Sequence, residues 1–578
     1  MEDVPRRINP GEVLMNRSLL AVALSLPAVF GLTQLSLAQM PNSQPGDAGV
    51  QIATVDSVHA GAPVVAAADV AANAGALPGE LPLALEPQSA SGQVPVLAAL
   101  PASSAMVPAP NAVAPVASAS QSVVAPPGFW KALFKAYYDD WHPGPGTPDP
   151  PKYRGDPMPT TNPPFPFTMW PMGGTVLIGY PNATSYPITQ ALQNGRHGDW
   201  WKKKNIQIYG WADLGMNLST SSGRPYGNLP AAYSEVPNTF QLDQAALYIE
   251  RTPDTIQTDH FDWGFRFTNL YGLDYRYTTA QGYFSGQLLN SPQKDGSMGQ
   301  RLGYDPVMMY VDLYFPHIGQ GTDVRMGRYV SLPDIEAQLA PNNYTYSHSL
   351  TYVYDCYTQT GINATTKWTN HWTTQVGFSA GCESAPWAPS AKPTANVCVA
   401  YSWHENGDNI YVCANSINDS KYNYNNLAAY YLTWYHKFGH SKWHTDWETW
   451  YQYMKDTPNV NNPAAASLLV NNSDGAFCNT ATQLTCYAPE WATLNYVARQ
   501  IGKDSVTLRN EFLDDIKGQR TGFQTKYSEH DIGWNHWIGT TIVFRPEVRY
   551  DHSYQAPAYD NGTKKSQLMF AADMIWFY

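Results

Sequence analysis

The sequence predicts an all-β protein, a transmembrane antiparallel up-and-down β-barrel of about 16 strands. The segment Thr541–Asp551 alternates between one face that holds Phe544 and Tyr550 and another that holds four consecutive charged positions. The same alternation recurs from about residue 205 to the end of the chain, and short and long connections follow each other in turn. Because successive strand side chains point to opposite faces, this pattern gives an apolar lipid-facing surface and a polar lumen.

The composition supports this fold class. Only 14% of the 578 residues are charged, while 38 Tyr and 19 Trp supply amphipathic rings suited to membrane–water interfaces. Outside the extreme N-terminus no run of 18 apolar residues occurs, which argues against a bundle of membrane helices. The formal charge of −12 argues against nucleic acid as a partner. Nothing in the pattern calls for a cofactor or a metal, and we expect none.

The N-terminal third divides into segments of different composition. Residues 1–38 are expected to be a signal peptide, with arginines before an apolar stretch and a small-x-small site before Gln39; a retained membrane anchor is the alternative. Residues 39–128 are rich in Ala, Pro, Val and Ser, which predicts a disordered segment in the periplasm. Residues 129–204 combine a predicted amphipathic helix, Phe129–Trp141, with a Pro-rich run. This region either plugs or caps the barrel or lies on the surface as a linker.

The barrel is expected to occupy residues 205–578, with a bulge near Gln244–Ala245. Short turns, among them Asn535–Trp537, are expected in the periplasm and long loops outside. The predicted strands are Ile206–Asn217, Phe240–Arg251, Phe261–Thr268, Val307–Phe315, Asp323–Tyr329, Ser347–Thr366, Trp372–Gly381, Val397–Trp403, Asn409–Cys413, Leu427–Phe438, Trp443–Tyr453, Ala492–Gln500, Ser505–Phe512, Thr525–Asn535, Ile538–Asp551 and Gln567–Tyr578.

The six cysteines of this exported chain predict three disulfides, since export permits their formation. Two pairs are equidistant from predicted turns, and the third closes a small ring in a long external loop. Metal ligation is the alternative, but neither CxxC spacing nor clustered His supports it. The expected pairs are Cys356 with Cys382, Cys398 with Cys413, and Cys478 with Cys486.

Inward-facing charges are the candidate functional residues of such a barrel. Mixed Arg and carboxylate side chains facing a wet lumen can tune the selectivity of a pore. Alternatively, they form salt bridges that only keep the wall folded, and the two interpretations are compatible. The expected pore-lining residues are Arg266, Glu448, Arg509, Glu511, Arg545, Glu547, Arg549 and Asp551.

The long loop after Tyr329 carries Asp334 and Glu336. If this loop folds inward, the two acids are candidate constriction residues; if it folds outward, it is a surface loop. We expect the inward course.

An enzymatic reading would need a constellation of catalytic groups. His444, Asp446 and Glu448 share one inward face, and Ser379 lies in a G-x-S-x-G pattern. That pattern requires a strand–turn–helix elbow to expose its serine, whereas here it ends a predicted barrel strand far from His444. Wall polarity therefore explains these residues better, and we expect no enzyme.

Three segments, Ser505–Thr521, Phe544–Asp551 and Lys564–Tyr578, resemble the outer-membrane OmpL-like β-barrel porin-2 family. The resemblance extends from about Asn205 to the end, and the R-x-E-x-R-x-D ladder is its most specific part. It implies a barrel in the bacterial outer membrane that passes solutes, but it names no substrate. The terminal Tyr578 departs from the Phe that more often ends such barrels.

We therefore expect a porin that allows passive diffusion of small hydrophilic solutes. Its expected partners are outer-membrane lipid, the outer-membrane assembly machinery and, by analogy of fold, two further copies in a homotrimer. A structural or adhesive barrel plugged by its N-terminal segment is the alternative, and a surface barrel hydrolase is a weaker one.

Overall fold

The computed structural model describes residues 126–144, 178–179, 186–223, 225–289, 300–330, 333–404, 408–439, 441–470 and 474–578. The predicted signal peptide, almost all of the predicted Ala/Pro-rich segment and most of the Pro-rich run lie outside the described residues.

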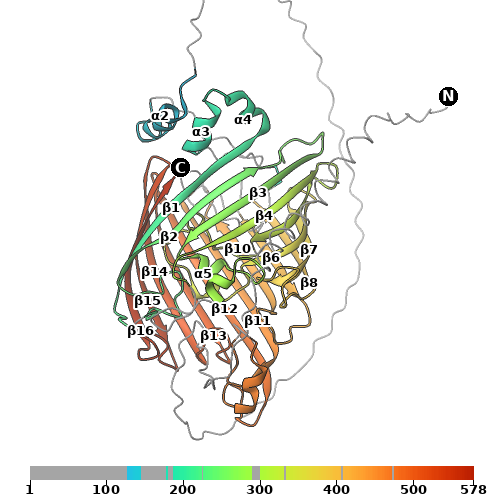
Figure 1. Ribbon diagram of the computed structural model, residues 1–578, viewed down its shortest axis with the longest axis vertical. Helices are drawn as coiled ribbons and strands as arrows, with labels where there is room; N and C mark the ends of the chain where they lie inside the picture. Colours follow the sequence, from blue (N-terminus) through green and yellow to red (C-terminus); the bar gives the residue numbers. More distant parts are fainter. Residues whose placement is uncertain are drawn as a thin grey trace, which may run out of the picture. The chain divides into compact units, whose positions relative to one another are not determined.

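Sixteen antiparallel strands close into one barrel, which confirms the predicted fold class (Figure 1). Each strand pairs with the next in sequence, and β16 returns to β1 with Asp213 opposite Ile575. Closure leaves no open sheet edge, as a hydrocarbon environment requires. The strands are β1 Ile206–Ser219, β2 Thr239–Arg251, β3 Asp262–Gly272, β4 Gly303–Phe315, β5 Thr322–Val330, β6 Thr358–Lys367, β7 Trp372–Cys382, β8 Thr394–Trp403, β9 Asp408–Ile417, β10 Ala428–Lys437, β11 Trp443–Pro458, β12 Thr485–Ile501, β13 Asp504–Asp515, β14 Thr525–Ile538, β15 Ile542–Ser553 and β16 Ser566–Phe577.

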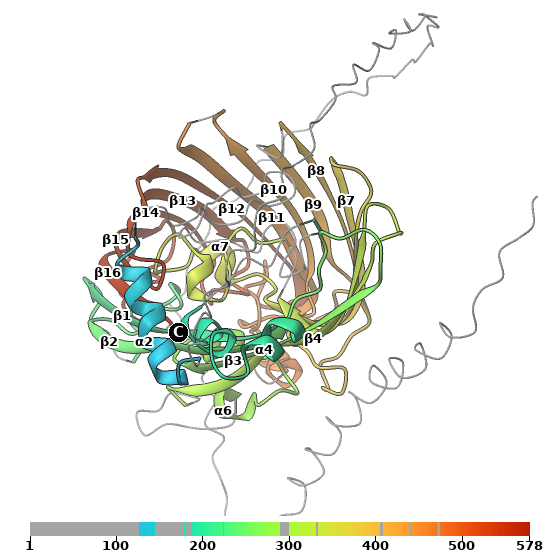
Figure 2. The ribbon, with the colours of Figure 1, turned by 90° about the horizontal axis from the view of Figure 1, so that it is seen from above.

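The helices are short. Among the described residues, no helix is long and apolar enough to cross a membrane. The helices are α2 Phe129–Trp141, α3 Pro187–Gln193, α4 Gly198–Lys204, α5 Tyr275–Thr278, α6 Gly286–Leu289 and α7 Leu350–Val353, with 3-10 turns η1 Ala340–Asn342 and η2 Pro463–Leu468. Helices α2, α3 and α4 precede β1, and α5, α6 and α7 lie in loops between strands. Helix α2 has the bounds predicted for it. Seen from above, α7 lies inside the ring of strands (Figure 2).

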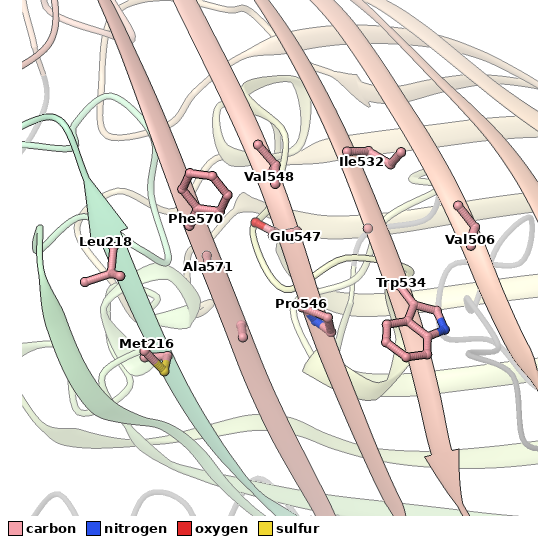
Figure 3. Close-up of a pocket in the computed structure, with 12 residues that line it drawn as sticks. Met216, Leu218, Val506, Ile532, Trp534, Pro546, Glu547, Val548, Phe570 and Ala571 are labelled. Carbon is pink, nitrogen blue, oxygen red and sulfur yellow. The ribbon is translucent and has the colours of Figure 1, made fainter.

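Burial follows the predicted alternation along the strands. In β15 the arginines Arg545 and Arg549 are at most 2% exposed, whereas Phe544 and Tyr550 are each 42% exposed. The outer face of β13 to β16 and β1 is apolar and contains a hollow between large side chains such as Trp534 and Phe570 (Figure 3). A continuous apolar outer face is what lipid contact requires.

One predicted strand begins in the wrong place. Residues 347–357 were expected in a strand, but β6 begins only at Thr358 and Leu350–Val353 forms α7. The physical reason is local capping: the Ser349 side chain accepts a hydrogen bond from the Tyr352 amide, which starts a helical turn.

The predicted turn at 535–537 is also wrong. Strand β14 continues to Ile538, and the chain turns at Gly539, where φ is +60°. Glycine adopts this left-handed conformation without the steric cost that a side chain brings. The predicted bulge is confirmed to within a residue, since Asp213 pairs with Gln244 and Leu214 with Leu242, leaving Asp243 as the extra residue.

Candidate functional site

The candidate site is the inward loop, residues 333–357 between β5 and β6, together with the wall that it touches. Side chains of β11, β13 and β15 hydrogen-bond to its backbone. Since these strand positions face the lumen, the predicted inward course of the loop is confirmed (Figure 2).

Three wall glutamates bind backbone amides of the inward loop. Glu448 of β11 accepts from Ile335 N at 2.8 Å. Glu511 of β13 accepts from the two successive amides of Leu350 and Thr351, each at 2.8 Å. Glu547 of β15 accepts in the same way from Tyr346 and Ser347. Carboxylates that accept such bonds form the stronger, charge-assisted class of hydrogen bond.

Wall arginines bind carbonyl oxygens of the same loop. Arg545 donates to Ala340 O at 2.8 Å and Asn343 O at 2.9 Å. Arg549 donates to His348 O, and Arg509 donates to Ser347 O and to Thr345 Oγ1. The arginines that alternate with glutamates along β13 and β15 therefore bind carbonyl groups of the loop, while the glutamates bind its amides.

Each of these arginines also pairs with a carboxylate. Arg509 binds Glu529 at 3.1 Å, Arg545 binds Asp573 through Nε at 2.9 Å, and Arg549 binds Asp551 at 2.8 Å. Leaving a buried guanidinium without such a partner would be costly. The partners Glu529, Asp531 and Asp573 escaped the sequence analysis, although their inward parity within the last strands could have identified them.

Seven of the eight expected pore-lining residues lie beneath the inward loop or beside it. They are at most 5% exposed and belong to β11, β13 and β15: Glu448, Arg509, Glu511, Arg545, Glu547, Arg549 and Asp551. The eighth, Arg266 of β3, pairs with Glu250 at 2.6 Å and has a side chain 16% exposed. Six of the seven contact the loop, and Asp551 holds Arg549 in place, so they dock the loop, while their part in a solute path stays a prediction.

Asp334 and Glu336 lie in the inward loop, and each is 5% exposed. Glu336 accepts hydrogen bonds from Ser349 and Tyr496 and pairs with Arg509. Its carboxylate is therefore directed to the wall. Burial raises the pKa of Asp334 to about 7. The expectation that these two acids line a constriction stays a prediction.

The middle of the loop packs through aromatic rings. His348 stacks on Tyr233 with ring centroids 3.8 Å apart, and its Nε2 bonds the carbonyl of Ala337 at 2.9 Å. Burial lowers the pKa of His348 to about 4, so the imidazole is neutral near pH 7. Sequence analysis missed this ring because alternation along strands says nothing about packing within a loop.

All three predicted disulfides are confirmed. Their Cα–Cα distances are 5.4 Å for Cys356–Cys382, 4.0 Å for Cys398–Cys413 and 5.8 Å for Cys478–Cys486. The first ties the end of the inward loop to the end of β7. The loop is thus held covalently at that end.

The G-x-S-x-G segment forms no nucleophile elbow. Ser379 lies within β7, is 3% exposed, and accepts from Gly381 N through its hydroxyl. His444, on β11, bonds the Tyr344 hydroxyl at 2.8 Å. The two residues thus lie on strands separated by β8, β9 and β10.

A closed sixteen-strand barrel with an apolar exterior and a loop folded inside defines a porin-type outer-membrane barrel. The chain belongs to the OmpL-like beta-barrel porin-2 family, whose model matches residues 205–577. No curated protein sequence matches the chain.

Several solved outer-membrane proteins are similar in structure. The anion-selective porin of Comamonas acidovorans is 9% identical with a TM-score of 0.40, the match covering 64% of this chain and 99% of that one. The outer membrane channel DcaP of Acinetobacter baumannii is 8% identical, also with a TM-score of 0.40, covering 64% and 97%. OprB of Pseudomonas putida is 12% identical with a TM-score of 0.36, covering 67% and 98%.

Proposed function

We propose that this porin passes small hydrophilic solutes by passive diffusion, through a lumen that the inward loop narrows. The observation that carries the proposal is the docking of residues 333–357 on a charged wall inside a closed barrel. A loop held by buried charge-assisted bonds keeps one position, so it sets a fixed width for the space that remains.

The proposal places the protein in the outer membrane and its N-terminal extension in the periplasm. Helix α2 supports this arrangement, because it binds the end of the barrel that carries the short turns. Asp140 accepts hydrogen bonds from the amides of Thr540 and Thr541, and the Tyr137 hydroxyl donates to Phe577 O at 2.9 Å. In the proposed orientation, this end of the barrel faces the periplasm.

Contacts between the N-terminal segment and the barrel favour a second candidate, a structural barrel whose lumen this segment closes. Tyr186 stacks on Tyr209 and on Phe577, and Thr189 donates to Ile208 O, so the segment is attached to β1 and β16. In that case the barrel would serve as an anchor, and residues 39–128 would reach into the periplasm. A surface hydrolase is the third candidate and predicts loss of hydrolysis in Ser379→Ala or His444→Ala.

Bilayer recordings of the full chain and of a variant lacking residues 40–200 separate the first two candidates. An open porin should conduct as the full chain and change little on deletion. A plugged barrel should be silent as the full chain and should conduct after deletion.

Assembly forms the last part of the proposal. The amphipathic strand β16, which carries Phe570 and Trp576 on its outer face, suits recognition by the outer-membrane assembly machinery. We also propose a homotrimer, which the mass of the protein in detergent, measured by light scattering, would test.

A further inference from the structure

Three buried carboxylates meet where the inward loop touches β11. Asp334 lies near the beginning of the loop, Asp355 lies near its end, and Glu448 lies on the wall. Each is at most 5% exposed, and one carboxylate oxygen from each lies within 4.8 Å of the other two. The cluster therefore joins both ends of the loop to one strand.

The oxygens of this cluster lack the partners that other wall acids have. Outside the cluster, the carboxylate oxygens of Asp334 and Asp355, and Oε1 of Glu448, have no hydrogen-bond partner, although the Asp334 and Asp355 carboxyl groups lie close enough to interact with each other. Glu448 uses only Oε2, which accepts from Ile335 N. In the described part of the chain, no Arg or Lys forms an ion pair with any of the three, in contrast to the arginine partners of the β14 to β16 acids. Buried unpaired carboxylates are costly unless protons or a cation compensate them.

A fourth polar group lies beside the cluster. Tyr431 of β10 is 3% exposed, and its buried hydroxyl forms no hydrogen bond of normal geometry, although it lies near the Cys356 backbone. The strand register places Thr433 opposite Glu448, so Tyr431 is the diagonal neighbour of Glu448 on the same inward face. The charges of Asp355, Asp334 and Glu448 are those that act on its hydroxyl most strongly.

We propose that Asp334, Asp355 and Glu448 bind one hard divalent cation, Ca²⁺ or Mg²⁺, which locks both ends of the inward loop to β11. Such cations take carboxylate and other oxygen ligands, and Ca²⁺ does so at about 2.3–2.6 Å. Ligands at that distance on opposite sides of one ion lie within roughly 5 Å of each other, which agrees with the spacing in the cluster. The site goes beyond the proposed function, because a cation can lock the loop whether or not solutes pass.

Protons are the competing ligands. Burial raises the pKa of Asp334 to about 7 and, with the neighbouring Asp334 carboxylate, raises the pKa of Asp355 well above its usual range. The other titratable groups that act on Asp334 and Asp355 or feel their charge are Glu336, Glu383, Tyr233, Tyr352, Tyr357, Tyr411 and Tyr431. Because carboxylates bind a cation only after they lose their protons, the affinity of the site should increase with pH.

The direct test is a Mn²⁺ titration followed by electron paramagnetic resonance. The probe is Mn²⁺ added at pH 7.5 to the full-length protein in detergent, after treatment with EDTA. We expect one Mn²⁺ per chain, displaced by Ca²⁺, and an affinity at least about 10-fold lower in Glu448→Gln, because a ligand is lost. Asp446→Asn is the matched control, since Asp446 is a buried acid two residues away on the same strand, and it should bind like the wild type.

Absence of bound Mn²⁺, or wild-type affinity in Glu448→Gln, would overturn the proposal. Should Glu448→Gln fail to migrate as a folded barrel in unheated gel samples, Asp355→Asn provides the same test from the loop side. A second measurement is the thermal midpoint in Ca²⁺ against EDTA. We expect Ca²⁺ to raise it in the wild type and not in Glu448→Gln. If low pH stabilises the protein and Ca²⁺ does not, the cluster holds protons only, and the proposal fails while the channel function stands.

Discussion

At the scale of single residues, the wall of this barrel is organised by buried arginines with two sets of partners. Arg509 illustrates the arrangement: it binds Glu529 of β14 on the wall and Glu336, Thr345 and Ser347 of the inward loop. The guanidinium suits this position because it offers five donors and stays charged when buried.

Arg509→Met should therefore destabilise the barrel strongly. Removing the cation leaves Glu529 and Glu336 buried without charge compensation, and such losses cost about 3–5 kcal/mol. Lys526→Ala is the control, because Lys526, which pairs with Asp514, has a side chain 47% exposed, and such a pair should contribute no more than about 1 kcal/mol. The measurement is the free energy of unfolding in denaturant from lipid vesicles. Equal losses in the two variants would contradict the account.

The face of each wall residue could be predicted from the sequence, but its partners could not. Strand parity predicted that Arg545, Glu547 and Arg549 face inward, because a period of two fixes the face of every strand residue. It could not predict that a loop would cover them, since that depends on contacts between segments about 200 residues apart. An inward strand residue that faces open lumen and one that a loop covers give the same alternation in the sequence.

At the scale of elements, the inward loop is the feature that distinguishes this barrel from a bare wall. Its conformation is set by backbone bonds to wall side chains rather than by regular pairing, and its one helical turn is capped by Ser349. The sequence predicts a strand through residues 347–357, but β6 begins only at Thr358. The Ser349 cap and the hydrogen bonds to Glu511 and Glu547 fix the conformation of this segment instead.

Glu511→Gln combined with Glu547→Gln should release the loop while preserving the barrel. Glu511 accepts its two backbone bonds through different oxygens, and a glutamine has only one acceptor oxygen, so one of these bonds is lost. At both positions the substitution also removes the charge that strengthens the bonds. We expect chymotrypsin to cut the loop at least several-fold faster, at sites that include Tyr346 and Tyr352. Asn363→Ala, an inward position of β6, is the control and should leave the rate unchanged. Loop cleavage at the wild-type rate in the double variant would contradict the docking role.

At the scale of the whole molecule, the alternation of turns and strands was enough to predict a closed barrel of sixteen strands. Errors were confined to ends of strands, where cap and turn geometry decide. Cysteine pairing followed from the same register: residues equidistant from a turn lie opposite each other, as Cys398 and Cys413 do. Placement of the N-terminal helices could not be predicted, because it depends on contacts such as Asp140 with Thr540, 400 residues away.

Mass mapping of the non-reduced protein tests this register. Peptides should be linked through Cys356–Cys382, Cys398–Cys413 and Cys478–Cys486, and all six cysteines should be protected from alkylation until a reductant is added. Any other connectivity would contradict the strand register on which the barrel depends.

The most direct test of the central claim is single-channel conductance, under a salt gradient, of the wild type and of a variant with residues 334–354 replaced by a short Gly/Ser linker. The account predicts discrete, steady openings in the wild type and a conductance several-fold higher in the variant, because the loop occupies the lumen. A silent wild type, or equal conductance in the two proteins, would contradict a solute path narrowed by the inward loop.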